Sequence, residues 1–300
     1  MSAGLASGTA NLSLADAVAP RSPALWRQAL GLNRTRIGLA IVILVGAVAW
    51  LGPYAAPYGA TEFVDAAYAP PSAAALFGAD NLGRDVLSRF LSGGRSVLTL
   101  SLIATLLGVA GGTAIGLVAA YARGRWPDEL LMRAMDILLA FPQIVFVLLL
   151  VASFGPQLWL IIATVAMTHV PRVARVARGA ALEVVERDFV KSAEALGETR
   201  GHILFAEILP NMSSPLLVEL GLRLTYSIGL IAAVSFLGFG LQPPAADWGL
   251  MINENRLGLT IQPWAVALPV LAIGLLTVGV NLVADGIARA AIGLDRRREG

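Results

Sequence analysis

The chain has 300 residues, of which 57% are hydrophobic and only 14% are charged. Soluble proteins carry about a quarter charged residues, so this composition indicates a chain largely surrounded by lipid. The formal net charge of +2 is small and the basic residues form no single stripe, which argues against a nucleic-acid-binding protein. The chain has no cysteine and only two histidines, His169 and His202. We therefore expect neither a cysteine nucleophile nor a histidine metal site.

Residues 1–36 are polar and mildly basic, and they lack the apolar core of a secretory signal. We interpret them as a cytoplasmic tail with an amphipathic lead-in from Trp26 to Leu32. Six apolar runs follow, and a helix needs about 20 apolar residues to cross a bilayer. The predicted spans are Ile37–Tyr54, Val97–Tyr121, Met135–Phe154, Leu158–Val176, Leu216–Phe239 and Trp264–Ala288. A soluble bundle is disfavoured because these runs lack a polar stripe, so the sequence predicts an all-α integral membrane protein with six transmembrane helices.

Basic residues indicate the orientation of these spans, because cytoplasmic loops carry an excess of Arg and Lys. With the N-terminus in the cytoplasm, 17 basic residues lie inside and four outside, and Arg223 lies within a span. Both termini are therefore predicted to be cytoplasmic. The resulting segments are a tail (1–36), a first transmembrane helix (37–57), an external segment (58–96), a core (97–290) with a cytoplasmic loop at about 180–212, and a cytoplasmic C-terminal tail (291–300).

Two patterns within the spans predict helix packing. Gly108, Gly112 and Gly116 recur every four residues, a spacing that allows close approach of helix backbones in lipid. Glu219 and Arg223 are four residues apart with the acid first, the favourable order for a helical ion pair.

Two further groups of charged residues lie near the membrane surfaces. Asp136 begins the third span and needs a partner, which we expect to be Arg133 or a residue of the fourth span. The external segment carries mixed charge around a glycine, at Asp80, Gly83, Arg84, Asp85, Ser88 and Arg89. It is predicted to form a hydrogen-bonded turn and an amphipathic helix that serve as a scaffold and gate contact, or alternatively as a docking site for a binding protein.

The long cytoplasmic loop has an amphipathic pattern that predicts a helix, a turn and a second helix. The apolar residues at roughly helical spacing are Val184, Phe189, Ala193 and Leu196. Gly197 can end the first helix, since glycine tolerates a left-handed conformation. Thr199 can cap the second helix, and Pro210 is expected to end it before the fifth span.

This loop resembles the EAA loop of ABC importer permeases. Ala193, Gly197, Leu209 and Pro210 match its pattern, whereas Lys191, Ser192 and Glu207 replace its usual Glu, Ala and Ile. Three more segments resemble the dipeptide, oligopeptide and nickel branch of that family, in particular its second, C-type permease subunit. These segments are Gly78–Arg89, Ser235–Gly249 and Asn281–Gly286.

The resemblance implies a permease subunit of the bacterial plasma membrane that forms half of a translocation pore. It implies a second homologous permease, two ATPase subunits, an extracytoplasmic solute-binding protein and the lipid bilayer as partners. The residues expected to couple to an ATPase are Lys191, Ser192, Ala193, Gly197, Glu198, Arg200, Leu209 and Pro210. We expect Ala193 and Gly197 to let the loop approach its ATPase closely, whereas Arg172, Arg175 and Arg178 reach lipid headgroups or contact an ATPase.

The chain has no Gly-x-x-x-x-Gly-Lys phosphate loop and no set of catalytic residues. We therefore expect no cofactor, metal or enzymatic activity in this chain, with ATP and Mg bound by the partner ATPases. Di- or oligopeptides are the expected substrates, and the residues that bind them are not predicted. The alternatives are a nickel or other small-solute permease of the same branch, a stand-alone secondary transporter, and a membrane enzyme.

Overall fold

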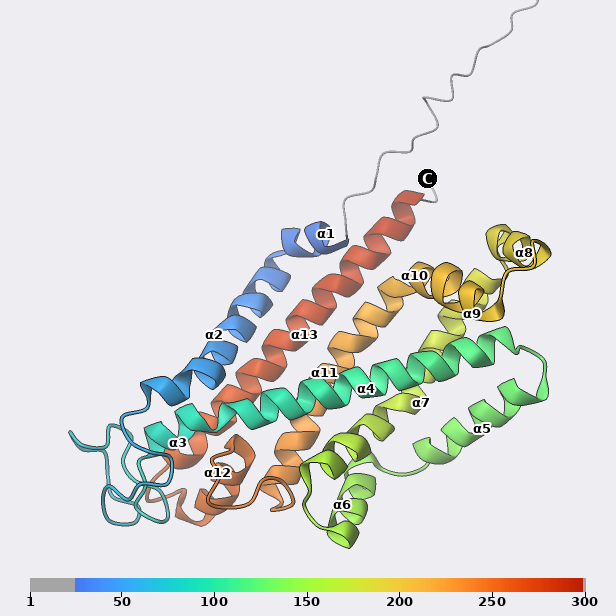
Figure 1. The fold of residues 1–300 in the computed structure, drawn as a ribbon. Helices are drawn as coiled ribbons and strands as arrows, with labels where there is room; N and C mark the ends of the chain where they lie inside the picture. The colour runs from blue at the N-terminus through green and yellow to red at the C-terminus, as the bar shows by residue number, and fades with distance from the viewer. Residues whose placement is uncertain (1–24, 299–300) are drawn as a thin grey trace, which may run out of the picture.

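The computed structural model describes residues 25–298, whose regular secondary structure is helical, with no strand assigned among them. Five of the described helices are long and apolar enough to cross a membrane. They are α2 (Asn33–Ala55), α4 (Gly94–Tyr121), α7 (Leu158–Val185), α11 (Ser213–Phe236) and α13 (Trp264–Arg298). Figure 1 shows them side by side in an elongated bundle, in which α4 packs on α7 and α13 packs on α2 and α11. The first 24 residues of the predicted tail lie outside the described residues.

The predicted third span, Met135–Phe154, is not one straight helix. It is divided into α5 (Trp126–Leu139) and α6 (Gln143–Phe154), whose axes differ by 82°. Pro142 explains the break, because it lacks a backbone N–H and restrains the residue before it from the helical conformation. The described part of the chain therefore has five helices that could each cross a membrane, or up to six spans if this bent pair crosses as one.

Two other predicted boundaries change. The helix α7 does not end at Val176 but continues to Val185, and α13 continues to Arg298 through most of the predicted C-terminal tail. Both helices therefore project beyond the predicted membrane core on the side to which we assign the cytoplasm.

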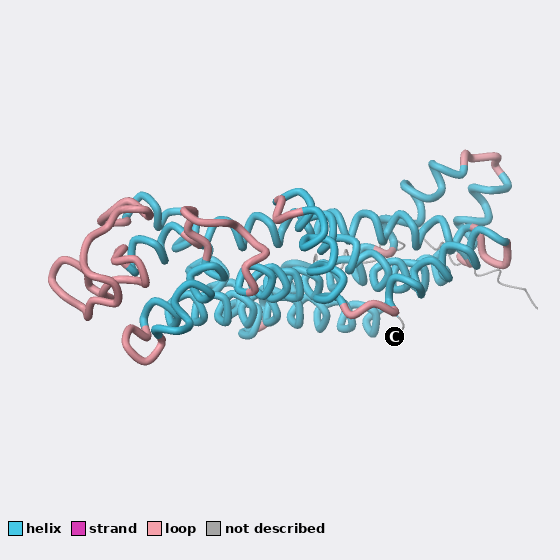
Figure 2. The backbone as a smooth tube through the Cα atoms, turned by 90° about the horizontal axis from the view of Figure 1, so that it is seen from below, coloured by secondary structure: helices cyan, strands magenta, loops and turns pink. Residues whose placement is uncertain are grey.

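Shorter helices gather at the two ends of the bundle. One end holds α1 (Leu25–Gly31), α8 (Asp188–Ala195), α9 (Arg200–His202), the π-helix η2 (Ile203–Ile208) and α10 (Leu209–Asn211). The other end holds α3 (Val86–Ser92), α12 (Trp248–Asn255) and the 3-10 turn η3 (Arg256–Gly258). The long loop that precedes α3 also lies at this second end, as Figure 2 shows from below. The first end thus holds the loop predicted to be cytoplasmic, and the second end holds the segment predicted to be external.

The predicted glycine face joins α4 to α7. A methyl group added at Gly112 would lie 2.6 Å from Cβ of Val173, and one at Gly116 would lie 2.6 Å from the carbonyl oxygen of Ala174. Nothing larger than glycine fits these positions without moving a helix. The packing role predicted for the four-residue spacing is therefore confirmed.

Candidate coupling site

A helical knob, residues 186–212, projects from the end of α7 on the side to which we assign the cytoplasm. Its first helix, α8, ends in a Schellman motif: the N–H of Glu198 donates to the carbonyl of Ala193, and the N–H of Gly197 donates to that of Glu194, both at 3.1 Å. Gly197 has φ +80°, and an added Cβ would meet nothing within 4 Å. Glycine is therefore favoured here because of its backbone conformation, and not because a larger side chain would lack space.

The second half of the knob begins as predicted and ends differently. The hydroxyl of Thr199 accepts a hydrogen bond from the N–H of His202 at 3.3 Å, which caps α9. Pro210 does not end the helix, because it lies in the first turn of α10, where its missing N–H costs little. The chain bends two residues later, at Met212 (φ −106°, ψ 15°), before α11 begins.

The side of α8 that is buried differs from the predicted one. Val190 and Ala193 are buried against a core shared with Ile203, Ile208 and Met212. Phe189 and Leu196, expected on the same face, are 41% and 83% exposed. The helix restarts at Asp188 after a turn, so the periodicity counted from Val184 does not continue through it.

Ala193 therefore packs inside the knob, and its role in a close approach to an ATPase stays a prediction. Leu209 is likewise half-buried in the same core. The other predicted coupling residues are exposed, namely Lys191, Ser192, Gly197, Glu198, Arg200 and Pro210.

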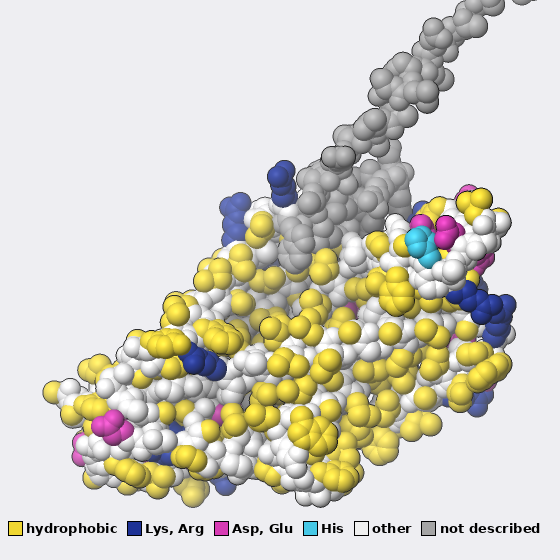
Figure 3. Space-filling model, in the orientation of Figure 1, with side chains coloured by type: hydrophobic (Ala, Val, Ile, Leu, Met, Phe, Trp, Pro, Cys, Tyr) yellow, Lys and Arg dark blue, Asp and Glu magenta, His cyan; other side chains and the backbone are white. Residues whose placement is uncertain are grey.

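The outer surface of the knob combines apolar and charged side chains. Phe205 is 65% exposed, in addition to Phe189 and Leu196. Acidic side chains and a histidine lie among hydrophobic ones over this region in Figure 3. His202 lies 4.0 Å from the carboxylate of Glu198. The sequence did not single out Phe205, although an apolar residue beside charged ones in a cytoplasmic loop could have indicated it.

Ion pairs fasten α5 and the turn before it to α7. The Nε and Nη2 atoms of Arg178 donate to the two carboxylate oxygens of Asp128, each at 2.7 Å. Arg175 pairs with Asp136, and Arg123 pairs with Glu186 at the end of α7.

Asp136 thus takes its partner from the fourth predicted span. The other expected partner, Arg133, pairs with Glu129. Arg175 and Arg178 bind carboxylates on α5 rather than extending only to lipid headgroups, because α7 continues past the position where the span was predicted to end.

Inside the bundle, polar side chains pair across helices. Arg223 donates to Glu219 at 2.8 Å, as predicted, and its guanidinium lies 5.1 Å from the ring centre of Tyr226. The sequence analysis missed a second group, in which Nε2 of His169 and the hydroxyl of Thr105 each lie 2.8 Å from the hydroxyl of Ser227. This group joins α4, α7 and α11 through one hydroxyl.

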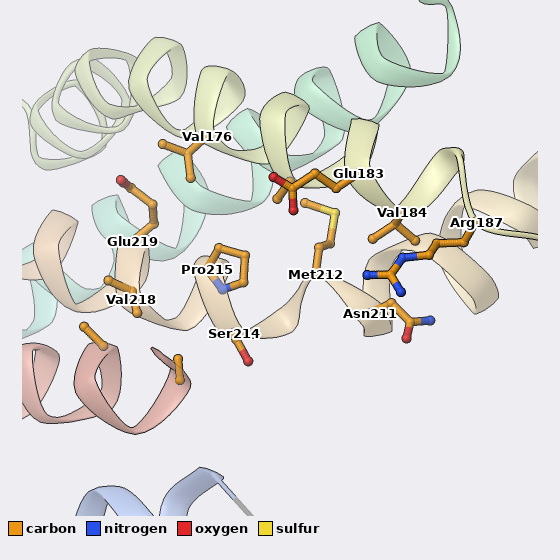
Figure 4. A pocket seen from close by; sticks show the side chains of 13 residues that line it. Val176, Glu183, Val184, Arg187, Asn211, Met212, Ser214, Pro215, Val218 and Glu219 are labelled. Carbon is orange, nitrogen blue, oxygen red and sulfur yellow. The ribbon is translucent and has the colours of Figure 1, made fainter. Parts of the chain in front are cut away.

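A cavity of about 840 Å³ separates the stem of the knob from α13. Its walls come from α7, α10, α11 and α13, and Figure 4 shows the side chains around it. The polar residues lining it are Glu183, Arg187, Asn211, Ser214 and Glu219. The knob is therefore attached through α7 and the start of α11, with open space between these stems and α13.

At the external end, the predicted charged residues form a buried cluster. Arg84 donates to Asp80 at 2.7 Å and to Glu254 of α12 at 3.1 Å, and Arg89 donates to Glu254 at 2.7 Å. Asp80, Arg84 and Arg89 are all at most 3% exposed. The cluster joins the external segment to α12, and its member Glu254 was absent from the predicted set.

The remaining predicted residues of this segment shape the turn. Asp85 caps α3 by accepting from the backbone N–H of Ser88 at 2.8 Å and from its hydroxyl at 2.6 Å. Gly83 has φ +84°, and an added Cβ would lie 2.1 Å from the carbonyl oxygen of Asp65. The arrangement has the hydrogen-bonded turn and short helix that the sequence predicts, whereas its role as gate or docking contact stays a prediction.

Comparisons with known proteins agree with this architecture. Residues 112–296 match the family described as binding-protein-dependent transport system inner membrane component. The chain is 37% identical over 267 residues to the glutathione transport system permease protein GsiD of Pectobacterium atrosepticum, covering 88% of each chain. It is 37% identical over 220 residues to the dipeptide transport system permease protein DppC of Alkalihalophilus pseudofirmus, covering 73% of this chain and 72% of the relative.

The fold is similar to a solved structure of the MetNI methionine ABC transporter in an inward-facing conformation. The TM-score is 0.52 at 19% identity, covering 68% of this chain and 95% of the other. These similarities agree with the multi-span helical architecture. The chain belongs to the binding-protein-dependent transport system inner membrane component family, and it is a multi-pass permease subunit of an ABC importer in a bacterial inner membrane.

Proposed function

We propose that this chain forms one half of the translocation pore of an importer for short peptides. Its relatives include proteins named for glutathione transport and for dipeptide transport, and glutathione is itself a tripeptide. Glutathione and dipeptides are both small, charged solutes that carry a peptide amide and a free carboxylate. Peptides of two or three residues are therefore the substrate class that these relatives support.

The proposed assembly contains a second homologous permease, two ATPase subunits and an extracytoplasmic solute-binding protein. ATP and Mg are bound by the ATPases and not by this chain, whose only lysine, Lys191, lies in the knob without a phosphate-binding loop around it. This chain has no hydrolytic role, and the energy reaches it mechanically.

The exposed knob carries the proposal that coupling occurs there. Leu196 and Phe205 expose most of their apolar surface at the end assigned to the cytoplasm, where an apolar patch rimmed by charges is typical of a protein contact. The core of the knob is continuous with α4 and α7, since Ala193 and Ile203 belong to one packed cluster with Leu117 and Ala177. An ATPase that moves the knob would therefore move both helices as a unit.

The test uses the whole importer, reconstituted with its binding protein in lipid vesicles. Leu196→Asp should abolish stimulation of ATP hydrolysis by the loaded binding protein and reduce dipeptide uptake by about tenfold or more, because it places a charge in an apolar contact. Leu257→Asp is the matched control, since Leu257 is 87% exposed at the opposite end. Normal coupling in Leu196→Asp would refute the knob as the ATPase contact.

The substrate class has its own readout. Uptake of a labelled dipeptide should be inhibited by excess unlabelled di- and tripeptides and unaffected by nickel. Uptake of nickel without uptake of peptide would overturn the peptide assignment and leave the coupling result intact.

A further inference from the structure

We propose that the groove between α2 and α4, at the external side of the bundle, is a binding site for an anionic phospholipid whose phosphate is held by Arg95. The groove encloses about 180 Å³ and is lined almost entirely by apolar side chains of α2, α4, α11 and α13. The lining residues used below are Val42, Trp50, Leu98 and Leu102.

Arg95 is fixed at the external mouth of this groove. Its Nη2 donates to the carbonyl of Trp50 at 2.7 Å, and its guanidinium lies 5.7 Å from the ring centre of Trp50 and 5.2 Å from that of Tyr54. Trp50 also lines the groove, so the cation and the apolar channel share a wall. The guanidinium is held in place before any ligand arrives, which lowers the entropy cost of binding.

The charge on Arg95 has no acidic partner within ion-pair distance among the described residues, unlike Arg84 and Arg89 in the buried external cluster. Its Nε is buried and has no hydrogen-bond partner in the described structure. A phosphate oxygen is the ligand that a guanidinium binds best, in a forked geometry that uses two N–H groups. The Nη1 group of Arg95, for which no hydrogen bond is found among the described residues, is the donor that we assign to the phosphate.

The direction of the groove fits a lipid and not a free anion. Arg95 lies in the first turn of α4, and Trp50 lies near the last turn of α2, so both are at the external surface. From Trp50 the groove extends along α2 to Val42, which is about 12 Å deeper toward the middle of the bilayer. A headgroup at Arg95 would place an acyl chain beside Leu98 and Leu102.

Trp50 and Tyr54 are 54% and 82% exposed, and aromatic residues of this kind are enriched where the acyl region meets the headgroups. Figure 3 shows a basic patch surrounded by hydrophobic side chains on the face over α2 and α4. Where such a face borders the bilayer, phospholipid is present at high local concentration.

The test is mass spectrometry of the complete importer released from membranes that contain phosphatidylglycerol and phosphatidylethanolamine. Arg95→Gln should reduce the fraction of complexes that retain one phosphatidylglycerol by about tenfold. Arg256→Gln, which removes another exposed external arginine, should leave that fraction unchanged. Equal retention by Arg95→Gln and wild type would overturn the proposal, as would loss of the lipid on addition of soluble inorganic phosphate.

A second pair of variants tests the groove itself. Leu102 and Leu106 are both 48% exposed on α4, but only Leu102 lines the groove. Leu102→Trp should displace the lipid while Leu106→Trp retains it. A photoreactive amino acid at position 102 should gain the mass of one phospholipid on irradiation; crosslinking to the second permease instead would show that a protein helix fills the groove and would refute the lipid site.

Discussion

Arg178 and Asp128 face each other across the gap between α7 and α5 and share two parallel hydrogen bonds of 2.7 Å. Asp128 is buried, and the Arg178 side chain is 30% exposed. A forked pair of this kind fixes both the distance and the relative rotation of the helices that carry it. The short helix before the bend at Pro142 is thereby held to the same helix that carries the knob.

Breaking this pair should disconnect α5 from α7. Asp128→Asn should destabilise the complex by about 2 kcal/mol, because a forked bond to a charged group is lost and Arg178 keeps its charge. Thermal unfolding and the ratio of peptide imported to ATP hydrolysed measure the effect, and both should fall. Arg133→Ala is the control, since its exposed pair with Glu129 contributes about 0.5 kcal/mol or less. If Arg133→Ala lowered both quantities and Asp128→Asn changed neither, the stabilising role of the Asp128–Arg178 pair would be contradicted.

Gly197 should tolerate added volume but not a changed backbone. Gly197→Ala is expected to cost about 1–2 kcal/mol because its φ of +80° is unfavourable for alanine, although the added methyl group has open space. Gly197→Asn should cost less, since asparagine adopts this conformation more readily. Gly201→Ala has equal space and no such φ, and it should be neutral or slightly stabilising. Apparent melting temperatures of the three variants provide the comparison, and equal values for Gly197→Ala and Gly201→Ala would contradict it.

Neighbouring glycines of α4 should respond oppositely to the same change. At Gly112 an added methyl would clash with Val173 at 2.6 Å, whereas at Gly111 the nearest atom, on Val170, is 3.5 Å away. Gly112→Ala should lower the yield of folded protein, at a cost of about 1–3 kcal/mol, because two helices must separate. Gly111→Ala should leave the yield unchanged or raise it. Size-exclusion chromatography of the detergent-solubilised chain compares the two variants. Equal yields would show that the contact between α4 and α7 can accommodate the added methyl group.

Asp247, at the external end, should make the free energy of unfolding depend on pH. Burial raises the pKa of its carboxyl above 3.8, against hydrogen bonds from Ser96 and the backbone of Leu250 that lower it. The folded state therefore keeps a proton that the unfolded state has lost. Stability falls as pH rises from the ordinary value through the raised one, by at most about 1.4 kcal/mol per pH unit.

Asp247→Asn should remove this slope while still capping α12, because asparagine is also a good helix cap. Melting temperatures measured from about pH 4 to pH 7 compare the two proteins. An identical slope in Asp247→Asn and wild type would assign the pH dependence to other groups.

Sequence patterns predicted the parts of this protein that depend on neighbouring residues. Five of the predicted spans follow from long apolar runs. The glycine face, the Thr199 cap, the turn at Gly197 and the pairing of Glu219 with Arg223 depend on spacings of about one helical turn. Charge asymmetry predicts which end of the bundle faces the cytoplasm, because it depends on composition and not on contacts.

The sequence could not indicate contacts between distant segments. Glu254 joins Arg84 and Arg89 from 165 or more positions away. Ser227 contacts His169 and Thr105, which are also distant from it in the sequence. A hydroxyl residue within an apolar run carries no pattern that predicts such a contact. The inward position of Ala193 also escaped prediction, because the short turn before Asp188 changed which side of α8 is buried. In each case the missing information was tertiary.

The unbroken length of α7 has a mechanical consequence. A helix of 28 residues is about 42 Å long, which exceeds the thickness of the hydrocarbon layer. The helix α4 has the same number of residues and packs against α7 along the glycine face, so the two packed helices resist bending together. Pro171 lies inside α7 and removes one backbone hydrogen bond there, but α4 contacts the helix on both sides of it, at Ala166 and at Ala174. If coupling occurs at the knob as we propose, a displacement of the cytoplasmic end of this pair would reach the opposite face of the membrane as tilt.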